Sequence, residues 1–230
     1  MIFLDSSDIK EIKRFNELGI ISGVTTNPSI MLRDGAKNLE DIKKRTIEIA
    51  EEMLDKPVSV EVLSNNPKDM IKQAKQFSDW ARNINIKIPF HGPNGELHNI
   101  KIMKELAQYG IDINCTAMMT AQQCACATIA GARFVSLFGG RVNDIGYNCI
   151  EEIKKIRNFL RNFHYEGDTD LIIGSVREPL NIIEWLNAGA DIVTTPPKIL
   201  EKSLIHPRTK ETVQQFLEDS AKLKGLLWTK

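Results

Sequence analysis

The sequence has few of the residues that usually hold metals or form disulfide bonds. Only four cysteines and four histidines occur among its 230 residues. A single residue separates Cys124 from Cys126, a spacing that fits neither a zinc knuckle nor a thioredoxin-type motif. The histidines show no paired spacing of the kind that metal ligands need. The sequence therefore predicts reduced thiols, no metal site and no cofactor.

An excess of charge of either sign is also missing. Lysine plus arginine and aspartate plus glutamate both number 30, so nothing points to nucleic acid or to an anionic membrane as a partner. No stretch approaches the ~20 apolar residues of a membrane span. The first residues, MIFLDSSD, lack the basic segment and the long apolar core of a signal peptide. We expect a cytoplasmic protein that binds neither nucleic acid nor membranes.

What the sequence does contain is a regular alternation of short apolar runs and longer amphipathic segments. This alternation is typical of a parallel sheet, and eight β–α units predict one (β/α)8 TIM barrel over residues 1–230, with an extra C-terminal helix. No GxGxxG motif follows the first run, which disfavours a dinucleotide-binding sheet. The expected strands are 1–5, 20–25, 57–63, 84–89, 111–116, 133–138, 170–175 and 190–195, and the clearest helices are 38–54, 66–81, 148–163 and 210–227.

Several of the expected strands are apolar on one side and polar on the other. In a barrel the apolar side must face the helices, so the polar side chains should point into the lumen. They also lie toward the carboxyl ends of their strands, where barrel enzymes have their active sites. The polar residues with this placement are Ser59, Glu61, Asn85, Lys87, Asn114, Thr116 and Ser175.

Lys87, in the stretch NINIKIPF (83–90), is the most informative of these residues. An exposed edge strand would explain a lysine there, but a closed barrel has no edges. A carboxylate beside Lys87 would keep its amine charged and inert, which makes a structural ion pair the remaining alternative. Among mostly neutral polar groups, a partly desolvated lysine would instead have a lowered pKa and could act as a nucleophile. We favour the reactive amine.

Five separated motifs support this interpretation: FLDSSD (3–8), GVTTNPSI (23–30), IKIP (86–89), FGGRVNDIG (138–146) and GSVRE (174–178). Together they resemble the motifs of the transaldolase family, in particular its small single-barrel subgroup, which includes the fructose-6-phosphate aldolases. The resemblance implies that Lys87 forms a Schiff base and that Asp5 moves protons. It also implies that the last two motifs bind an anion.

The reaction that the resemblance implies begins with condensation of Lys87 and a ketose. Cleavage of the C3–C4 bond then leaves a dihydroxyacetone unit on the lysine, and an aldehyde such as glyceraldehyde 3-phosphate accepts this unit. Asp5 would carry the proton of the C4 hydroxyl, while Glu61 and Thr116 would hold the water that relays protons. The substrate contacts expected from the resemblance are Thr26, Asn27, Asn114, Ser136, Phe138, Arg141, Ser175 and Arg177.

Some of these residues have simpler alternative roles. Asp5 precedes a helical segment and could be its N-cap, although Ser6 or Ser7 could fill that role equally well. Asn27 could be a turn residue before Pro28. Arg141 and Arg177 could be surface arginines in salt bridges, whereas together with the start of the helix after Ser175 they would form an anion site.

Two positions bear on the fate of the three-carbon unit. Within the resemblance, fructose-6-phosphate aldolases have glutamine and tyrosine where this chain has Glu61 and Phe138, whereas transaldolases have glutamate and phenylalanine. Asn114 also matches the transaldolases. We therefore expect transfer to an acceptor, with a class I aldolase that releases free dihydroxyacetone as the alternative. A barrel without activity would be expected to have lost Asp5, Lys87 or the Glu61–Thr116 pair, and all four residues are present.

The substrate end departs from the resemblance. Gly139 stands where valine is usual, Glu178 stands beside the presumed anion site, and the loop 89–99 is unusual in having two histidines and two glycines. Ketose and aldose phosphates are the expected substrates. A sulfonate would satisfy the same donors, so sulfofructose is a further candidate.

The expected final helix (210–227) is not needed to close the barrel. It has more apolar residues than a lone exposed helix normally shows. In the family that the chain resembles, such a helix packs on a neighbouring subunit of a ring, often in a decamer of two pentamers. We expect a homo-oligomer. The apolar residues are Val213, Phe216, Leu217, Leu223, Leu226, Leu227 and Trp228.

Overall fold

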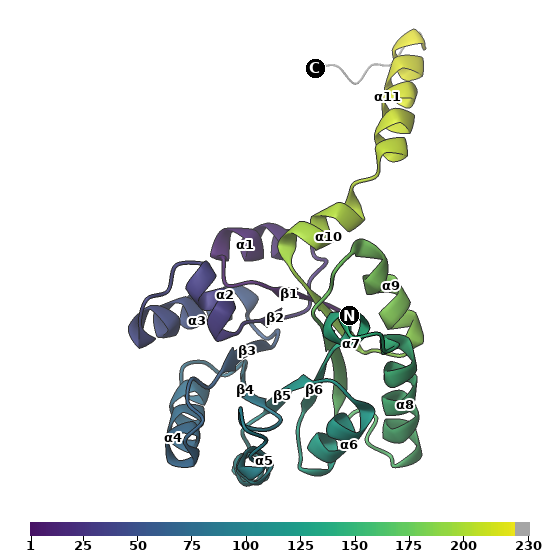
Figure 1. The fold of residues 1–230 in the computed structure, drawn as a ribbon. Coiled ribbons are helices and arrows are strands. Elements are labelled where there is room, and N and C mark those ends of the chain that lie inside the picture. The colour runs from purple at the N-terminus through teal and green to yellow at the C-terminus, as the bar shows by residue number, and fades with distance from the viewer. Residues whose placement is uncertain (224–230) are drawn as a thin grey trace.

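Parallel strands close into a barrel in the computed structural model, which describes residues 1–223 (Figure 1). Each strand pairs with the next one in the chain, and the last pairs with the first. The predicted (β/α)8 fold is confirmed. The eight strands of the described residues are β1 (Ile2–Asp5), β2 (Val24–Thr25), β3 (Val58–Glu61), β4 (Ile84–Pro89), β5 (Ile113–Met118), β6 (Phe134–Phe138), β7 (Asp170–Gly174) and β8 (Ile192–Thr195).

Helices surround the barrel on its outside, and asparagines define where several of them begin. The side chains of Asn27, Asn38, Asn66 and Asn148 accept hydrogen bonds from backbone N–H groups in the first turn of their helices. The helices within residues 1–223 are α1 (Ile9–Glu17), α2 (Pro28–Arg33), α3 (Leu39–Met53), α4 (Pro67–Ser78), α5 (His98–Gln108), α6 (Ala121–Ile129), α7 (Gly139–Asp144), α8 (Cys149–Asn162), α9 (Pro179–Ala188), α10 (Pro197–Leu204) and α11 (Pro207–Lys222).

Two strands differ most from the expected bounds. β2 is shorter than the predicted 20–25, although the N–H of Ser22 and the carbonyl of Gly23 still bond to the backbone of β1. β5 extends to Met118 because its register against β6 shifts after Cys115. Ala117 has a φ of 60° in this irregular stretch. Such a bulge bends a strand at the rim of a barrel.

The hydrophobic core is divided in two because side chains alternate between the outside and the inside of the barrel along each strand. The apolar residues of β3, β4 and β7 that face outward pack with the helices in one large cluster, and burial of each such side chain contributes roughly 1.5–3 kcal/mol. A smaller cluster, the lumen floor, consists of Phe3, Phe134, Ile172 and Ile192. These residues share the inward side of their strands with Asp5, Ser136, Gly174 and Thr194. The lumen is therefore closed by apolar side chains beneath its polar carboxyl end.

The C-terminal helix α11 points away from the barrel (Figure 1), and none of its residues is buried. Phe216 is 66% exposed and Leu217 is 62% exposed. The helix begins at Pro207, earlier than the expected residue 210. The end of the predicted segment (224–227) and the residues Leu226, Leu227 and Trp228 lie outside the described residues. Its packing on a neighbouring subunit stays a prediction.

In the described part of the chain, no helix has both the length and the apolar character that a membrane crossing requires.

Candidate active site

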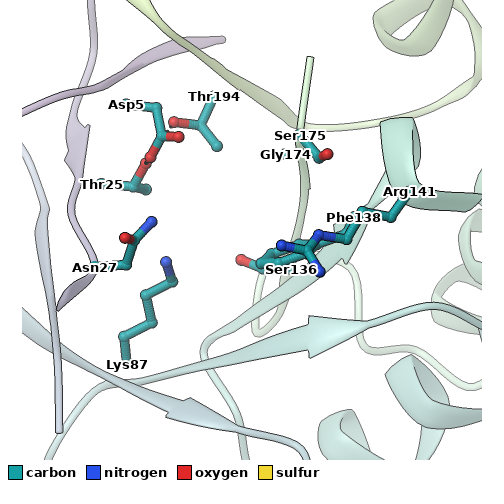
Figure 2. Close-up of a pocket in the computed structure, with 10 residues that line it drawn as sticks. All are labelled: Asp5, Thr25, Asn27, Lys87, Ser136, Phe138, Arg141, Gly174, Ser175 and Thr194. Carbon is teal, nitrogen blue, oxygen red and sulfur yellow. Dashed lines mark hydrogen bonds between the residues drawn. The ribbon is translucent and has the colours of Figure 1, made fainter. Parts of the chain in front are cut away.

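A cavity of about 150 Å³ opens at the carboxyl ends of the strands (Figure 2). Its walls come from β1, β2, β4, β6, β7 and β8 and from the segments that follow them. The cavity therefore lies at the end of the barrel where the sequence placed the polar side chains. The residues that line it are Asp5, Thr25, Asn27, Lys87, Ser136, Phe138, Arg141, Gly174, Ser175 and Thr194.

Lys87 reaches into this cavity from β4 and is only 4% exposed. Its Nζ donates a hydrogen bond to the carbonyl of Thr26 at 3.0 Å and lies 3.5 Å from the Glu61 carboxylate. The expectation of mostly neutral neighbours is therefore wrong. Glu61 stands directly beside Lys87 because β3 and β4 pair in that register. From the sequence, an ion pair and a reactive amine are alternative roles for Lys87. In the structure, Lys87 pairs with Glu61 and its amine also faces the cavity.

Burial shapes the charge of Glu61. Desolvation raises the pKa of this carboxyl above its ordinary value, and the nearby Lys87 opposes the rise. Glu61 does not line the cavity with Lys87. It lines a neighbouring cavity of about 390 Å³ together with Pro28, His91 and Asn99. The unusual loop 89–99 thus forms one wall of a second opening beside the Lys87–Glu61 pair.

Asp5 faces the cavity from the end of β1, where its Oδ1 accepts a hydrogen bond from the Thr25 hydroxyl at 2.7 Å. Burial raises the pKa of Asp5, while the Lys87 ammonium and the Thr25 hydrogen bond act in the opposite direction. The N-cap alternative is wrong for Asp5, Ser6 and Ser7, because Asp8 caps α1 by accepting a hydrogen bond from the Lys10 N–H. Asp5 has no such structural role.

The two residues after Thr25 have distinct roles. Asn27 caps α2, since its Oδ1 accepts from the Ile30 N–H, and it also lines the cavity. Asn27 can therefore have a structural role at the start of α2 and still face the cavity. Thr26 does not line the cavity. Its hydroxyl donates to the carbonyl of Ser59, and its own carbonyl accepts from Lys87.

A chain of polar side chains crosses the lumen below Ser136. The Ser136 hydroxyl donates to Asn114 Oδ1 at 2.6 Å, and Asn114 Nδ2 donates to the Ser59 hydroxyl at 3.0 Å. Ser59 in turn donates to Asn85 Oδ1 at 2.5 Å. Asn114 does not line the cavity. It orients Ser136, which presents the acceptor side of its hydroxyl to the cavity.

Thr116 is buried next to this chain, on the inward side of β5. Its hydroxyl has no hydrogen-bond partner within residues 1–223. A buried hydroxyl normally has a partner, so this one is available to a small polar molecule. Thr116 is not among the residues that line the Lys87 cavity.

The opposite end of the cavity carries Phe138 and Arg141. The Arg141 guanidinium lies 5.5 Å from the centroid of the Phe138 ring, and among residues 1–223 it has no carboxylate partner. Arg177 differs, because it forms a salt bridge with Asp144 at 2.5 Å and does not line the cavity. The salt-bridge alternative therefore describes Arg177 and does not describe Arg141.

The N–H groups of the two residues just before the helix that follows Ser175 already have a partner. Asn181 Oδ1 accepts hydrogen bonds from the N–H groups of Arg177 and Glu178, and Glu178 is the N-cap of α9. Ser175 itself lines the cavity, with a φ of 63°. Such a left-handed backbone is uncommon for a residue other than glycine and often occurs at functional sites.

Close packing explains why α7 begins with two glycines, Gly139 and Gly140. A Cβ atom at Gly140 would overlap the carbonyl oxygen of Ser175, so glycine allows α7 to approach the end of β7. A Cβ atom at Gly139 would lie 2.6 Å from the Cys149 sulfur and 2.9 Å from the Trp185 ring. The glycine found in place of the expected valine thus accommodates a large buried tryptophan.

Thr25, Gly174 and Thr194 line the cavity although the sequence did not single them out. Thr194 could have been found, because it lies two residues after Ile192 and therefore on the inward side of β8. Thr25 occurs in the GVTTNPSI motif, in which the sequence indicated only Thr26 and Asn27 as substrate contacts. No side-chain signal could have identified Gly174.

Within residues 1–223, no three histidine, cysteine, aspartate or glutamate side chains group as a metal site would require.

Comparisons with known proteins extend these observations. The chain matches the family described as Transaldolase/Fructose-6-phosphate aldolase over residues 2–227. It is 40% identical to a "Probable transaldolase" of Carboxydothermus hydrogenoformans over 97% of this chain and 99% of that protein. It is 34% identical to a protein of the same name from Nitrosopumilus maritimus over 97% and 96% of the two chains. Among solved structures, a lactate oxidase of Pediococcus acidilactici is similar in fold alone, with a TM-score of 0.58 and 14% identity over 88% of this chain and 64% of the other.

Proposed function

Because the chain belongs to the transaldolase/fructose-6-phosphate aldolase family and is thus a transaldolase-type enzyme, we propose that it transfers a dihydroxyacetone unit through a Schiff base on Lys87. One observation carries the proposal. The amine of Lys87 is almost fully buried, lies beside Glu61 and faces a cavity that Asp5 also lines. A buried amine with carboxyl groups close by has what imine formation requires, a nucleophile and proton carriers.

In the first half of the reaction, the Lys87 amine attacks the carbonyl carbon C2 of a ketose. The amine must be neutral to attack, so its proton passes to Glu61, whose raised pKa makes the carboxyl a better acceptor than an ordinary one. The carbinolamine then loses its hydroxyl as water, with the proton supplied from Glu61. A water held between Glu61 and the Thr116 hydroxyl, which has no partner among the residues that the structure describes, would relay these protons.

In the second half, Asp5 takes the proton of the C4 hydroxyl. The C3–C4 bond breaks, its electron pair moves into the protonated imine, and an aldehyde leaves. The resulting enamine attacks the carbonyl carbon of the acceptor aldehyde, and Asp5 returns its proton to the new hydroxyl. Water then hydrolyses the new imine by the reverse of its formation, which releases the product ketose and frees Lys87. Asn27 and Ser136 are placed to bond the hydroxyls of the three-carbon unit.

Arg141 supports an anionic group at the far end of both donor and acceptor. A guanidinium at the cavity wall that has no carboxylate partner in the described part of the chain is suited to a phosphate or a sulfonate. We therefore propose ketose and aldose phosphates or sulfonates as substrates, with glyceraldehyde 3-phosphate as an acceptor and sulfofructose as a further donor candidate. Phe138, with Glu61, favours transfer over the release of free dihydroxyacetone by a class I aldolase.

Borohydride trapping tests the proposal. Reduction in the presence of a ketose 6-phosphate should add the mass of a three-carbon or full ketose adduct to Lys87, and Lys87→Ala should abolish both the adduct and donor cleavage. Lys56 provides the matched control, because its amine is held by Asn16 and the carbonyl of Ile21 away from the cavity. Lys56→Gln should still form the adduct. Donor cleavage retained in Lys87→Ala would contradict the assignment.

We also propose that the chain assembles into a homo-oligomer through α11, as a decamer of two pentamers. The support is the helix itself, which contributes no buried residue and exposes Phe216 and Leu217 away from the barrel. Sedimentation as a monomer at micromolar concentration would contradict this assembly.

A further inference from the structure

Behind Asp5, two threonine hydroxyls form a chain that ends at its carboxylate. The Thr194 hydroxyl on β8 lies 2.6 Å from the Thr25 hydroxyl on β2, which lies 2.7 Å from Asp5 Oδ1. β1 lies between β2 and β8, so the chain links the two strands that flank Asp5. Figure 2 shows the three side chains gathered on one side of the cavity, across from Arg141. Thr25 is 2% exposed and Thr194 is 6% exposed.

The chemistry of these groups sets the direction of the hydrogen bonds. An ionised carboxylate can only accept, so the single hydrogen of Thr25 must point to Asp5 when Asp5 is charged. Among these three hydrogen-bonded groups, the hydroxyl hydrogen of Thr194 can then point only to the Thr25 oxygen. If Asp5 instead carries the proton, the chain can reverse, and the Thr194 hydrogen has no acceptor among the described residues. A carboxylate is also a stronger acceptor than a neutral carboxyl, so the complete set of hydrogen bonds favours the ionised form of Asp5.

We propose that Thr194 is a positioning residue for the reaction. It fixes the Thr25 hydroxyl as a donor to Asp5, and it thereby holds this carboxylate charged and oriented toward the C4 hydroxyl of the substrate. This inference rests on the proposed role of Asp5 as the proton carrier. A donor that itself receives a hydrogen bond is polarised and becomes a stronger donor.

Other charged groups also act on Asp5, and the hydroxyl chain adds to them. Lys87 on β4 and Arg33 on α2 favour the carboxylate. Asp34, the C-cap of α2, and Glu61 on β3 disfavour it. Burial raises the pKa of Asp5, whereas the positive charges of Lys87 and Arg33 lower it. Loss of the Thr194 hydroxyl removes a group that favours the charged form. The pKa of Asp5 should then rise further, and the acid limb of the rate profile should move to higher pH.

The variants Thr194→Val and Thr194→Ser test this inference, because the first removes the hydroxyl at similar volume and the second retains it. Thr194→Val should lower kcat by about threefold to tenfold, the range that a single hydrogen bond supports. The loss should be largest below neutral pH, with KM nearly unchanged, and Thr194→Ser should restore the wild-type pH profile. If Thr194→Val lowers the thermal midpoint, Thr194→Ala replaces it in the same comparison.

The adjacent Thr195 supplies a matched control on the same strand. Its hydroxyl is buried without a hydrogen-bond partner among residues 1–223, and its side chain alternates to the opposite side of β8. Thr195→Val removes the same chemical group one position away and should leave the pH profile unchanged. An equal shift in Thr195→Val and Thr194→Val would overturn the inference.

Borohydride trapping separates this inference from the proposed function. Failure of the wild-type protein to form a Lys87 adduct would remove the proposed function itself. An adduct that forms normally in Thr194→Val, with slow cleavage and a shifted acid limb, supports a role through Asp5. A wild-type pH profile in Thr194→Val would overturn that role while leaving the Schiff base intact.

Discussion

The two ends of the candidate active site differ in what holds their charged side chains in place. Lys87 lies on a barrel strand, and Glu61 stands opposite it because β3 and β4 pair in register. Arg141 and Arg177 instead project from the short helix α7 and from the segment before α9, and the side chain of Arg177 is 54% exposed. Strand register allows one arrangement, whereas exposed side chains can rearrange at little cost. The buried end is therefore suited to fixed chemistry and the exposed end to adjustment between substrates.

The largest expected effect lies at the buried end. Asp5→Asn keeps an oxygen that can accept from Thr25 but removes the group that takes the C4 proton. We expect kcat for donor cleavage to fall by about 10²–10⁴-fold, the usual contribution of a general acid–base residue. Steady-state kinetics on a ketose 6-phosphate would measure this loss.

Stability should respond in the opposite direction. Burial raises the pKa of Asp5, so the folded barrel holds this carboxylate at a cost in the charged form. Asp5→Asn removes the cost, and its thermal midpoint at neutral pH should equal or exceed that of the wild-type protein. In the wild-type enzyme, activity should decline as the pH falls through the raised pKa, above the range of an ordinary aspartate. A variant that is both inactive and clearly destabilised would contradict the separation between chemistry and fold at this end.

A smaller effect is expected at the exposed end, and it should distinguish the two arginines. Arg141→Gln removes the guanidinium that lines the cavity, and kcat/KM for an anionic donor should fall by about tenfold to a hundredfold, as for a charge-assisted hydrogen bond. Arg177→Gln removes a half-exposed partner of Asp144, and its effect should stay under about threefold. An uncharged ketose provides the control, because neither variant should alter its turnover. Equal losses in both variants would show that Arg177 leaves Asp144 to bind the substrate.

The contrast between the ends also explains what the sequence could predict. Alternation in β3, β4 and β5 was sufficient to place Glu61, Lys87 and Asn114 inside the lumen, because side chains alternate strictly along a strand. The barrel itself followed from the eight repeats. The register between β3 and β4 could not be predicted, since it depends on how the whole ring closes. For this reason the sequence placed Glu61 in the lumen on the strand next to Lys87 but did not predict that the two side chains pair directly.

At the exposed end, motifs identified the residues but not their hydrogen-bond partners. The pairing of Arg177 with Asp144, and the use of the Arg177 and Glu178 N–H groups by Asn181, depend on loop conformations that no periodic pattern encodes. The reason for Gly139 emerged only when Cys149 and Trp185 were found against it. Residues far apart in the sequence create such constraints, and local patterns do not record them.

The smallest expected effect concerns the choice between transfer and release, and it tests whether Glu61 belongs to the fixed chemistry. Glu61→Gln preserves the volume but cannot carry a proton, and it leaves Lys87 without its nearby carboxylate. We expect slower transfer and a rise of about threefold to tenfold in the share of free dihydroxyacetone, comparable with the loss of one polar contact. The measurement is the ratio of transferred to released three-carbon product at identical donor and acceptor concentrations.

The pH dependence of this ratio sharpens the test. Burial raises the pKa of Glu61, so the wild-type carboxyl becomes protonated as the pH falls through a value above the ordinary glutamate range. Below that value the wild-type enzyme should behave like Glu61→Gln, and above it the share of transfer should rise. The ratio in Glu61→Gln should lose the part of this pH dependence that comes from Glu61, because glutamine does not titrate. If the wild-type protein mainly releases dihydroxyacetone at every pH, or if the substitution leaves the ratio unchanged, the aldolase alternative takes the place of the transaldolase reaction.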